Sequence, residues 1–286
     1  MMTEYVHQPD FMTGDEFSIP TFSLLSPEGE LHDGASEPAL ERDHARRIYH
    51  AMLATRILDE RMMAAQRQGR LSFYMQCTGE EAAVVGATAA LDDADMIMAQ
   101  YREQGALAYR GFTTDEFMNQ LFGNERDTAH GRQMPIHYGS RDLHYLTISS
   151  PLATQIPQAT GYAYGQKLAG EGHCTITVFG EGAASEGDFH AALNFASVYK
   201  SPVVFVIENN RYGMGTSVAR HSATPTMYSR GEAYNIPNEE VDGMDIEAVR
   251  EAGLRAINHA RAGKGPYVLG MQTYRYRGHS MSDPAK

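Results

Sequence analysis

The chain of 286 residues is 42% hydrophobic, which allows one large buried core, and it holds no apolar stretch long enough to cross a membrane. Its formal charge is −12 and it shows no basic stripe, so nucleic acid is excluded as an expected partner. Cys77 and Cys174 stand alone without metal-ligand spacing, which favours a reduced, intracellular setting.

The first 40 residues differ in composition from the rest of the chain. They hold eight Asp and Glu residues, no Lys or Arg, and scattered Pro and Gly without periodicity, so we expect an acidic, extended tail over residues 1–42. A mitochondrial transit peptide is rich in Arg and poor in acidic residues, and a secretory signal begins with a basic region. Neither description fits, and we therefore expect a bacterial-type cytoplasmic protein.

Helices and strands alternate over residues 43–286, which predicts one α/β domain with a doubly wound parallel sheet. The first long helix is predicted over residues 43–68 and ends at Gly69. Its expected core-facing residues are Ile48, Met52, Leu53 and Ile57. A short strand over residues 95–99 then leads into Gln100, Tyr101 and Arg102.

The next elements form a βαβ unit. Residues 174–179 and 203–207 are β-branched and aromatic runs of strand length, and residues 185–200 between them have a helical period. Ser185 and Asp188 have capping-box spacing, so the helix is expected to begin directly after the Gly-Glu-Gly turn. The crossover makes the two strands parallel, and their carboxyl ends therefore fall on the same edge of the sheet.

Glu181 and Asn210 stand at those two strand ends and are expected to meet. Carboxylate, carboxamide and carbonyl oxygens are hard donors that suit Mg²⁺ or Ca²⁺, and Mg²⁺ also binds phosphate oxygens. Gly180 and Gly182 allow close backbone approach, and the helix start offers free N–H groups to an anion. A GxG turn and an Asn pair are each common in ordinary loops, but their joint position at one edge predicts a metal-bound phosphate site.

A further strand is predicted over residues 267–273 and runs into Arg275, Arg277 and His279. In open α/β sheets ligands bind outside the carboxyl ends of the strands, so the strand-end motifs point to one pocket. Taken alone, an arginine such as Arg102 is most simply a surface residue, and His279 a solvated loop residue. From the residues alone, a plain nucleotide-binding βαβ protein therefore stays open as an alternative.

The Gly-Glu-Gly turn, followed after 26 residues by Asn209 and Asn210, resembles the thiamine diphosphate motif of GDG and a later NN. Further stretches narrow the resemblance: YREQGALAYRGF, GRQMPIHYGS, ISSPLATQIPQATG, ENNRYGMGTSV, VDGMDIEAVR and TYRYRGHSMSDP. From about Ile48 to the last residue, the chain resembles the alpha subunit of the thiamine-dependent decarboxylating component of 2-oxo acid dehydrogenase complexes.

This resemblance implies the thiamine diphosphate-binding fold, with thiamine diphosphate and Mg²⁺ as cofactors and a small-molecule 2-oxo acid as substrate. The implied reaction is oxidative decarboxylation of the 2-oxo acid, with acyl transfer to the lipoyl group of a partner acyltransferase. The family also implies a separate beta subunit, an alpha-beta heterotetramer, and activity only when both subunits are present. Family members continue well past the SMSDP stretch, so residues 43–286 are expected to lack their C-terminal segment.

Carried over position by position, the resemblance implies a role for each strand-end residue. His279 is the implied catalytic residue and also faces the cofactor diphosphate. The other implied cofactor contacts are Gln100, Tyr101, Arg102, Ser150, Leu152, Glu181, Gly182, Ala183 and Asn210. The implied Mg²⁺ ligands are Glu181, Asn210 and the carbonyl of Tyr212, with glutamate in place of the commoner aspartate. In branched-chain members the stretch from Ile148 to Gln158 also binds potassium, and the implied ligands here are Ser149, Thr154 and Gln155.

The implied substrate class is divided along the chain. Residues 66–197 resemble the branched-chain enzyme, whereas the chain from Glu208 onward resembles the pyruvate enzyme, and Glu208 replaces a branched-chain arginine that contacts the diphosphate. Phe73, Tyr74 and Met75 stand where pyruvate enzymes place a histidine, and apolar groups there suit a branched aliphatic tail, so we expect a 3-methyl-2-oxobutanoate dehydrogenase. A pyruvate dehydrogenase, an acetoin dehydrogenase and a truncated, cofactor-binding but inactive relative stay open as alternatives.

Overall fold

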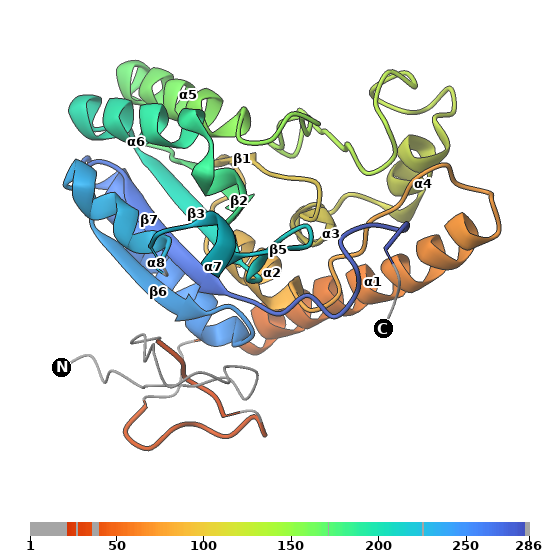
Figure 1. The fold of residues 1–286 in the computed structure, drawn as a ribbon, viewed down its shortest axis with the longest axis horizontal. Helices are drawn as coiled ribbons and strands as arrows, with labels where there is room; N and C mark the ends of the chain where they lie inside the picture. The colour runs from red at the N-terminus through yellow and green to blue at the C-terminus, as the bar shows by residue number, and fades with distance from the viewer. Residues whose placement is uncertain (1–21, 27, 36–39, 171, 225, 284–286) are drawn as a thin grey trace.

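A five-stranded parallel sheet lies at the centre of the computed structural model, which describes residues 22–26, 28–35, 40–170, 172–224 and 226–283 (Figure 1). The strand order is β1-β2-β3-β7-β6. These strands are β1 (Met96–Met98), β2 (Thr175–Gly180), β3 (Val203–Asn209), β6 (Asn238–Asp242) and β7 (Tyr267–Gln272). A small antiparallel pair is formed by β4 (Tyr212–Gly213) and β5 (Thr216–Ser217).

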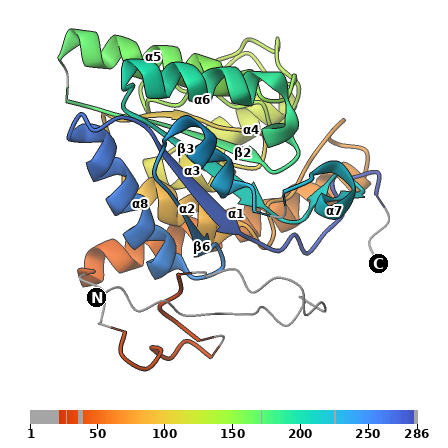
Figure 2. The same cartoon turned by 60° about the vertical axis from the view of Figure 1, so that its left-hand side comes forward.

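Helices cover both faces of the sheet (Figures 1 and 2). One face is covered by α5 (Gln155–Ala169) and α6 (Gly187–Tyr199), and the other by α8 (Ile246–Arg261) with α2 (Glu81–Ala89) packed on it. The other helices are α1 (Arg42–Arg67), α3 (Gln104–Arg110), α4 (Thr114–Phe122), α7 (Val218–His221) and the 3-10 helices η1 (Ala183–Ser185) and η2 (Tyr228–Tyr234). The predicted doubly wound α/β fold is confirmed. In the described part of the chain, none of the helices has both the length and the apolar composition of a membrane span.

The central strand β3 is buried on both faces, as its continuous apolar run predicts. Val204 and Val206 belong to the core cluster shared with α8, whereas Phe205 and Ile207 belong to the cluster shared with α5 and α6. Successive side chains of a strand point to opposite faces, so β3 holds the two halves of the core together. This packing fixes the carboxyl ends of β2 and β3 side by side.

The long first helix is confirmed as α1, but the prediction of its buried face is wrong at two positions. Leu53 and Ile57 are 44% and 48% exposed, and Met52 is only partly buried. The residues that α1 buries are Ile48, Ala51, Thr55, Asp59 and Ala65. Two residues turn a helix by about 200°, so Leu53 and Ile57 face away from the side of α1 that packs on α2 and α3.

The helix of the βαβ unit begins later than the capping pattern predicts. Ser185 belongs to η1, and α6 begins at Gly187 with Glu186 as an N-cap residue that makes no side-chain cap bond. The Ser185 cap is therefore wrong. Ser185 and Glu186 instead donate their N–H groups to the carbonyls of Gly182 and Ala183. Because the first N–H groups of a helical turn have no partner within it, η1 presents free donors directly after β2.

Part of the predicted acidic tail is bound to the sheet. Phe22 pairs with the outer edge of β6, where it donates to the Glu240 carbonyl (3.2 Å) and accepts the N–H of Asp242 (2.9 Å). One carboxylate oxygen of Asp245 accepts the N–H groups of Leu24 and Leu25, and the other caps the start of α8. Residues 1–21, 27 and 36–39 of the predicted tail lie outside the described residues.

Gly79 allows the segment after β7 to lie against the turn before α2. Its φ is +104°, and a Cβ there would lie 2.0 Å from the Tyr274 carbonyl oxygen and 2.6 Å from the Tyr276 ring. Gly79→Ala is therefore expected to lower the free energy of unfolding by about 2–4 kcal/mol, through backbone strain and overpacking. Urea unfolding measures this change.

Gly161→Ala is the matched control for Gly79, because α5 has open space at Gly161. Alanine favours a helix interior over glycine by about 1 kcal/mol, so the control variant is expected to be slightly more stable than wild type. Similar effects of the two substitutions would contradict the close approach at Gly79.

Candidate functional site

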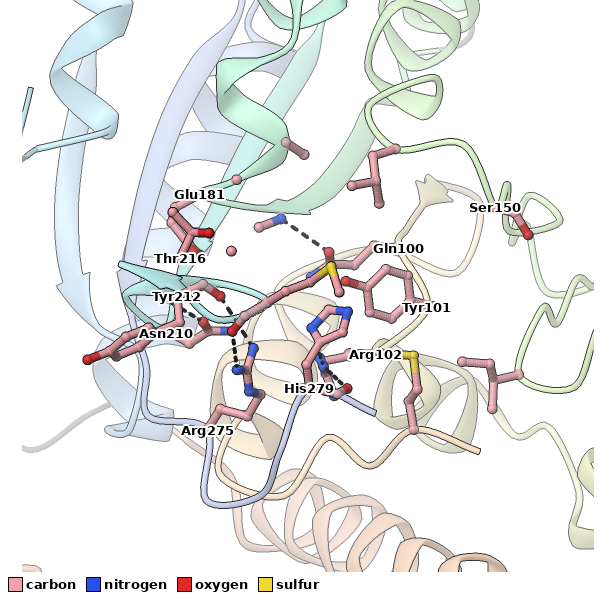
Figure 3. A pocket seen from close by; sticks show the side chains of 18 of the residues that line it. Gln100, Tyr101, Arg102, Ser150, Glu181, Asn210, Tyr212, Thr216, Arg275 and His279 are labelled. Atoms are coloured by element: carbon pink, nitrogen blue, oxygen red, sulfur yellow. Dashed lines mark hydrogen bonds between the residues drawn. The ribbon is translucent and has the colours of Figure 1, made fainter. Parts of the chain in front are cut away.

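A cavity of about 510 Å³ lies at the carboxyl ends of β1, β2 and β3, and the segment after β7 completes its wall (Figure 3). Eleven of the residues that the resemblance implies as cofactor or Mg²⁺ contacts line it. They are Gln100, Tyr101, Arg102, Ser150, Leu152, Glu181, Gly182, Ala183, Asn210, Tyr212 and His279. The parallel sheet therefore brings residues from five separate stretches of the chain to one place.

Glu181 and Asn210 follow β2 and β3, which pair in parallel with Gly180 opposite Glu208. The Asn210 carboxamide donates to Glu80 (2.8 Å), and its oxygen accepts the N–H of Tyr212 (3.2 Å). Glu80 thereby fixes which side of the amide presents oxygen to the cavity.

The Glu181 side chain is buried, and its Oε1 has no hydrogen-bond partner among the described residues. Burial raises the pKa of Glu181 to about 7, although the backbone N–H groups of Glu181 and Asn210 partly oppose this shift. A buried carboxylate oxygen without a partner is costly. A cation held between Glu181, Asn210 and the Tyr212 carbonyl would satisfy it, so the donor set fits Mg²⁺.

Arg102 is buried beneath the cavity and forms a network with His279 and Glu80. Its guanidinium donates to the backbone carbonyl of His279 and to the carbonyl of Gln76, and it approaches Nδ1 of His279 (3.2 Å) and Glu80 Oε2 (3.7 Å). Burial, and then the cations Arg102 and Arg275, lower the pKa of His279 to about 4. His279 is therefore neutral at pH 7, with Nδ1 as the acceptor and the proton on Nε2.

Arg275 and His137 line the cavity but had no assigned role from the sequence. Arg275 donates to the carbonyls of Tyr212 (3.3 Å), in β4, and Met214 (3.0 Å), in the turn between β4 and β5 (Figure 3). His137 Nε2 lies 2.7 Å from the Ser150 hydroxyl, and its Nδ1 lies 3.1 Å from the Pro135 carbonyl. Arg275 follows a predicted strand, which is a usable signal, whereas His137 lies in a loop that has no periodicity.

The three residues implied as potassium ligands do not line the cavity. The Thr154 hydroxyl lies 2.8 Å from the Ser149 hydroxyl and 3.0 Å from the Pro151 carbonyl, so three oxygens gather before α5. Gln155 is separate from this group, because its amide donates to the Val178 carbonyl on β2 (3.1 Å).

One wall of the cavity is apolar, although not with all the residues expected from the sequence. Phe73 and Met75 line it together with Met134, Ile136 and Leu152. The expectation for Tyr74 is wrong, because its side chain is fully buried on the other side of the segment and donates to Asp59 (2.8 Å). Alternation along an extended segment explains why residues 73 and 75 face one way and residue 74 the other.

Glu208 does not line the cavity, so it does not occupy the place of a diphosphate-binding arginine. Its carboxyl accepts the Gln100 amide (3.0 Å) and interacts with Glu103, which is also fully buried. Burial, and then repulsion from Glu80, raise the pKa of Glu103 to about 8, and burial likewise raises the pKa of Glu208. The Glu103 carboxyl therefore holds a proton at neutral pH.

Glu103→Gln is expected to flatten the pH dependence of stability between about pH 5 and 8. The pKa of Glu103 is about 8 in the folded chain against an ordinary value of 4.5, so the folded state holds a proton that unfolding releases. Stability then falls as the pH rises through this interval, by about 1.4 kcal/mol per pH unit for one proton. The neutral amide removes that contribution, and urea unfolding across the interval measures it.

Glu125→Gln provides the control for Glu103, because Glu125 is exposed. Its pH profile is expected to follow that of the wild type. A Glu103→Gln profile with the wild-type slope would contradict a raised pKa of Glu103 in the folded chain.

Comparison with known proteins gives a consistent result. The family model described as "Dehydrogenase E1 component" matches residues 49–286. The chain is 44% identical over 265 residues to 2-oxoisovalerate dehydrogenase subunit alpha 1, mitochondrial, of Arabidopsis thaliana, covering 93% of this chain and 56% of the relative. It is 42% identical over 276 residues to the mitochondrial 2-oxoisovalerate dehydrogenase alpha subunits of Bos taurus and Homo sapiens, covering 96% of this chain and 60% and 61% of those relatives. The chain thus spans less than two thirds of the length of each.

These comparisons correct the expected location. All three relatives are named as mitochondrial proteins, so the expectation of a cytoplasmic protein is wrong. That expectation rested on the acidic composition of the first 40 residues. The identity of 42–44% to mitochondrial proteins is stronger evidence than this composition.

Proposed function

Because this chain belongs to the dehydrogenase E1 component family, we propose that it is the alpha subunit of a thiamine diphosphate-dependent 2-oxo acid dehydrogenase of the branched-chain type. The observation that carries the proposal is the buried Glu181 oxygen, which has no partner in the described part of the chain and lines the same cavity as Asn210 and Tyr212, at the carboxyl edge of the sheet. This donor set suits a magnesium ion that carries a diphosphate. The reaction is oxidative decarboxylation of a 2-oxo acid, with acyl transfer to a lipoyl group.

Different residues of the cavity would bind the metal ion and the diphosphate of the cofactor. Glu181, Asn210 and the Tyr212 carbonyl would hold Mg²⁺, and the backbone of Gly182 and Ala183 would lie against the diphosphate. A Cβ on Gly182 would lie 3.4 Å from the Cα of Gly213, so the chain is closely packed at this turn. When bound, thiamine diphosphate supplies the carbanion that attacks the keto carbon and the electron sink that stabilises the product of CO₂ loss.

The protein's own part in the chemistry falls to His279 and the groups around it. Arg102 holds Nδ1 of His279, which leaves Nε2–H as a donor toward the substrate or cofactor. The Tyr101 and His279 rings are arranged edge to face, with their centroids 5.9 Å apart. His137 and Ser150 supply a second polar pair at the opposite wall, where they can orient the carboxylate of a 2-oxo acid.

The apolar wall supports a branched aliphatic 2-oxo acid as substrate. Phe73, Met75, Met134, Ile136 and Leu152 offer carbon and sulfur surface to a branched tail. One methylene in such a pocket changes specificity by about 1–3 kcal/mol, so preference over pyruvate is expected rather than strict exclusion. The names of the relatives, as 2-oxoisovalerate dehydrogenase subunits, support the same class.

The proposed assembly contains partners and a further ion. The relatives are named as alpha subunits, and we infer a beta subunit, an alpha-beta heterotetramer and a lipoyl-bearing acyltransferase as partners of this chain. Potassium is inferred at Ser149, Thr154 and Gln155; the Ser149 and Thr154 hydroxyls lie together, and the Gln155 amide nitrogen is bonded to Val178, which leaves its oxygen as the proposed ligand. Hydroxyl and carbonyl oxygens are suitable but weakly selective ligands for such a cation.

Reconstitution tests the proposed function. The chain is combined with a candidate beta subunit, thiamine diphosphate and Mg²⁺, and turnover is compared on 3-methyl-2-oxobutanoate, pyruvate and acetoin. We expect the branched substrate to have the highest kcat/KM and the single chain to show no turnover. A higher kcat/KM for pyruvate or acetoin would contradict the proposed branched-chain substrate. Cofactor binding without turnover, whichever beta subunit is added, would favour an inactive relative.

A further inference from the structure

His221, the last residue of α7, also lines the cavity. Both of its ring nitrogens are buried, and neither has a hydrogen-bond partner within the described part of the chain. Buried polar groups are nearly always hydrogen-bonded. An imidazole in the wall of a cavity, without a partner among the described residues, therefore indicates a bound ligand as its partner.

The His221 ring lies next to two glycines of the cavity wall, Gly182 and Gly213. Gly182 and Gly213 lie so close that a Cβ on Gly213 would be 3.6 Å from the Cα of Gly182. The same Cβ would be 3.9 Å from Nε2 of His221. The imidazole therefore lies beside the glycine pair, where η1 begins and presents free backbone N–H groups.

Arg230 fixes α7 against the same turn. Its guanidinium donates to the Ala184 carbonyl in η1 and to the hydroxyl of Ser222 (2.7 Å), the residue directly after His221. The Ser222 N–H is bound in turn to the Val218 carbonyl at the start of α7 (2.9 Å). One side chain thus joins the turn after β2 to the end of α7, so the backbone at His221 is held in place before any ligand arrives.

We propose that His221 donates a hydrogen bond to the diphosphate of thiamine diphosphate, an inference that rests on the proposed function. A neutral imidazole always carries one N–H, so this bond does not depend on protonation of the ring. Phosphate oxygens are strong acceptors, and hydrogen bonds to charged groups are about twice as strong as those between neutral groups. The Glu208 carboxyl is turned toward Gln100, whose amide it accepts, and His221 adds a donor to those that His279 and Arg275 bring to the cavity.

Calorimetric titration of the chain with its beta subunit tests this proposal. Thiamine diphosphate, thiamine monophosphate and thiamine are titrated in the presence of Mg²⁺ into wild type and the variants His221→Ala, His221→Leu and His221→Gln. Loss of a hydrogen bond to a charged group is expected to weaken thiamine diphosphate binding by about tenfold in the Ala and Leu variants. Gln keeps an N–H donor and is expected to stay within about threefold of wild type.

The pattern over the three ligands separates a diphosphate contact from a change in the fold. Thiamine lacks phosphate, so its affinity is expected to be unchanged, and His50→Ala, at an exposed position on α1, is expected to change no affinity. Equal losses for thiamine and thiamine diphosphate, or wild-type affinity in both the Ala and Leu variants, would overturn the role of His221 alone. Failure of wild type to bind thiamine diphosphate would overturn the proposed function as well.

Discussion

Glu181→Ala is expected to weaken Mg²⁺-dependent binding of thiamine diphosphate by about 100-fold or more. The substitution removes the carboxylate whose buried Oε1 has no other partner among the described residues, and with it the one charged donor of the proposed metal site. Loss of residues that only support metal ligands already costs about 10–100-fold in affinity, so loss of a ligand is expected to cost at least the upper end. Calorimetric titration with and without Mg²⁺, in the presence of the beta subunit, measures the effect.

Stability provides an independent readout at the same position. Burial raises the folded pKa of Glu181 to about 7 from an ordinary 4.5, so the folded state loses stability as the pH rises between these values. Above pH 7 without metal, Glu181→Gln is therefore expected to be more stable than wild type, by up to about 3 kcal/mol. The exposed neighbour Glu186 is the control, and Glu186→Ala should alter neither property. Wild-type affinity in both Glu181 variants would remove the metal assignment.

Arg102→Met is expected to lower the free energy of unfolding by about 3–5 kcal/mol and to abolish cofactor binding. Arg102 is 2% exposed and Glu80 is fully buried, and removing one partner of a buried ion pair leaves the other charge without compensation. The same change releases His279, whose carbonyl and Nδ1 both contact the guanidinium. Urea unfolding and calorimetric titration together measure the two losses.

The double variant Arg102→Met/Glu80→Gln separates these two effects. Neutralising Glu80 removes the uncompensated charge, so stability is expected to recover in part, while cofactor binding stays lost. Arg46→Met is the control, because Arg46 pairs with Asp43 at an exposed site and such pairs contribute about 1 kcal/mol or less. A single variant as stable as wild type would contradict the buried network.

The sheet and its site edge were predictable because the signals are local. Apolar runs mark β2, β3 and β7, and the residues directly after each run, such as Glu181, Asn210 and Arg275, necessarily reach the same edge of a parallel sheet. The roles of individual residues at that edge required the family resemblance. They stay proposals, because no ligand contact defines them.

Other features depend on contacts between distant parts of the chain and left no local signal. In the sequence, Glu80 is one of two adjacent glutamates at a helix start, a pattern typical of exposed residues. In the structure it is fully buried and accepts hydrogen bonds from Asn210 and Thr273. His221 stands in a four-residue helix, where periodicity cannot be measured. The prediction of the buried face of α1 was also wrong at two positions. A helix with apolar residues on several sides does not indicate which side its neighbours cover.

The pairing of Phe22 with β6 has a consequence for how the isolated chain behaves in solution. The outer edge of β6 would otherwise present unpaired backbone groups, and such edges join the edges of other molecules. Phe22 pairs with this edge, and Asp245 holds the residues that follow it, Leu24 and Leu25. The pairing of the amino-terminal segment with β6 is therefore expected to prevent self-association at this edge. A chain that begins at Asp43 is expected to aggregate, although it keeps all the residues that line the cavity.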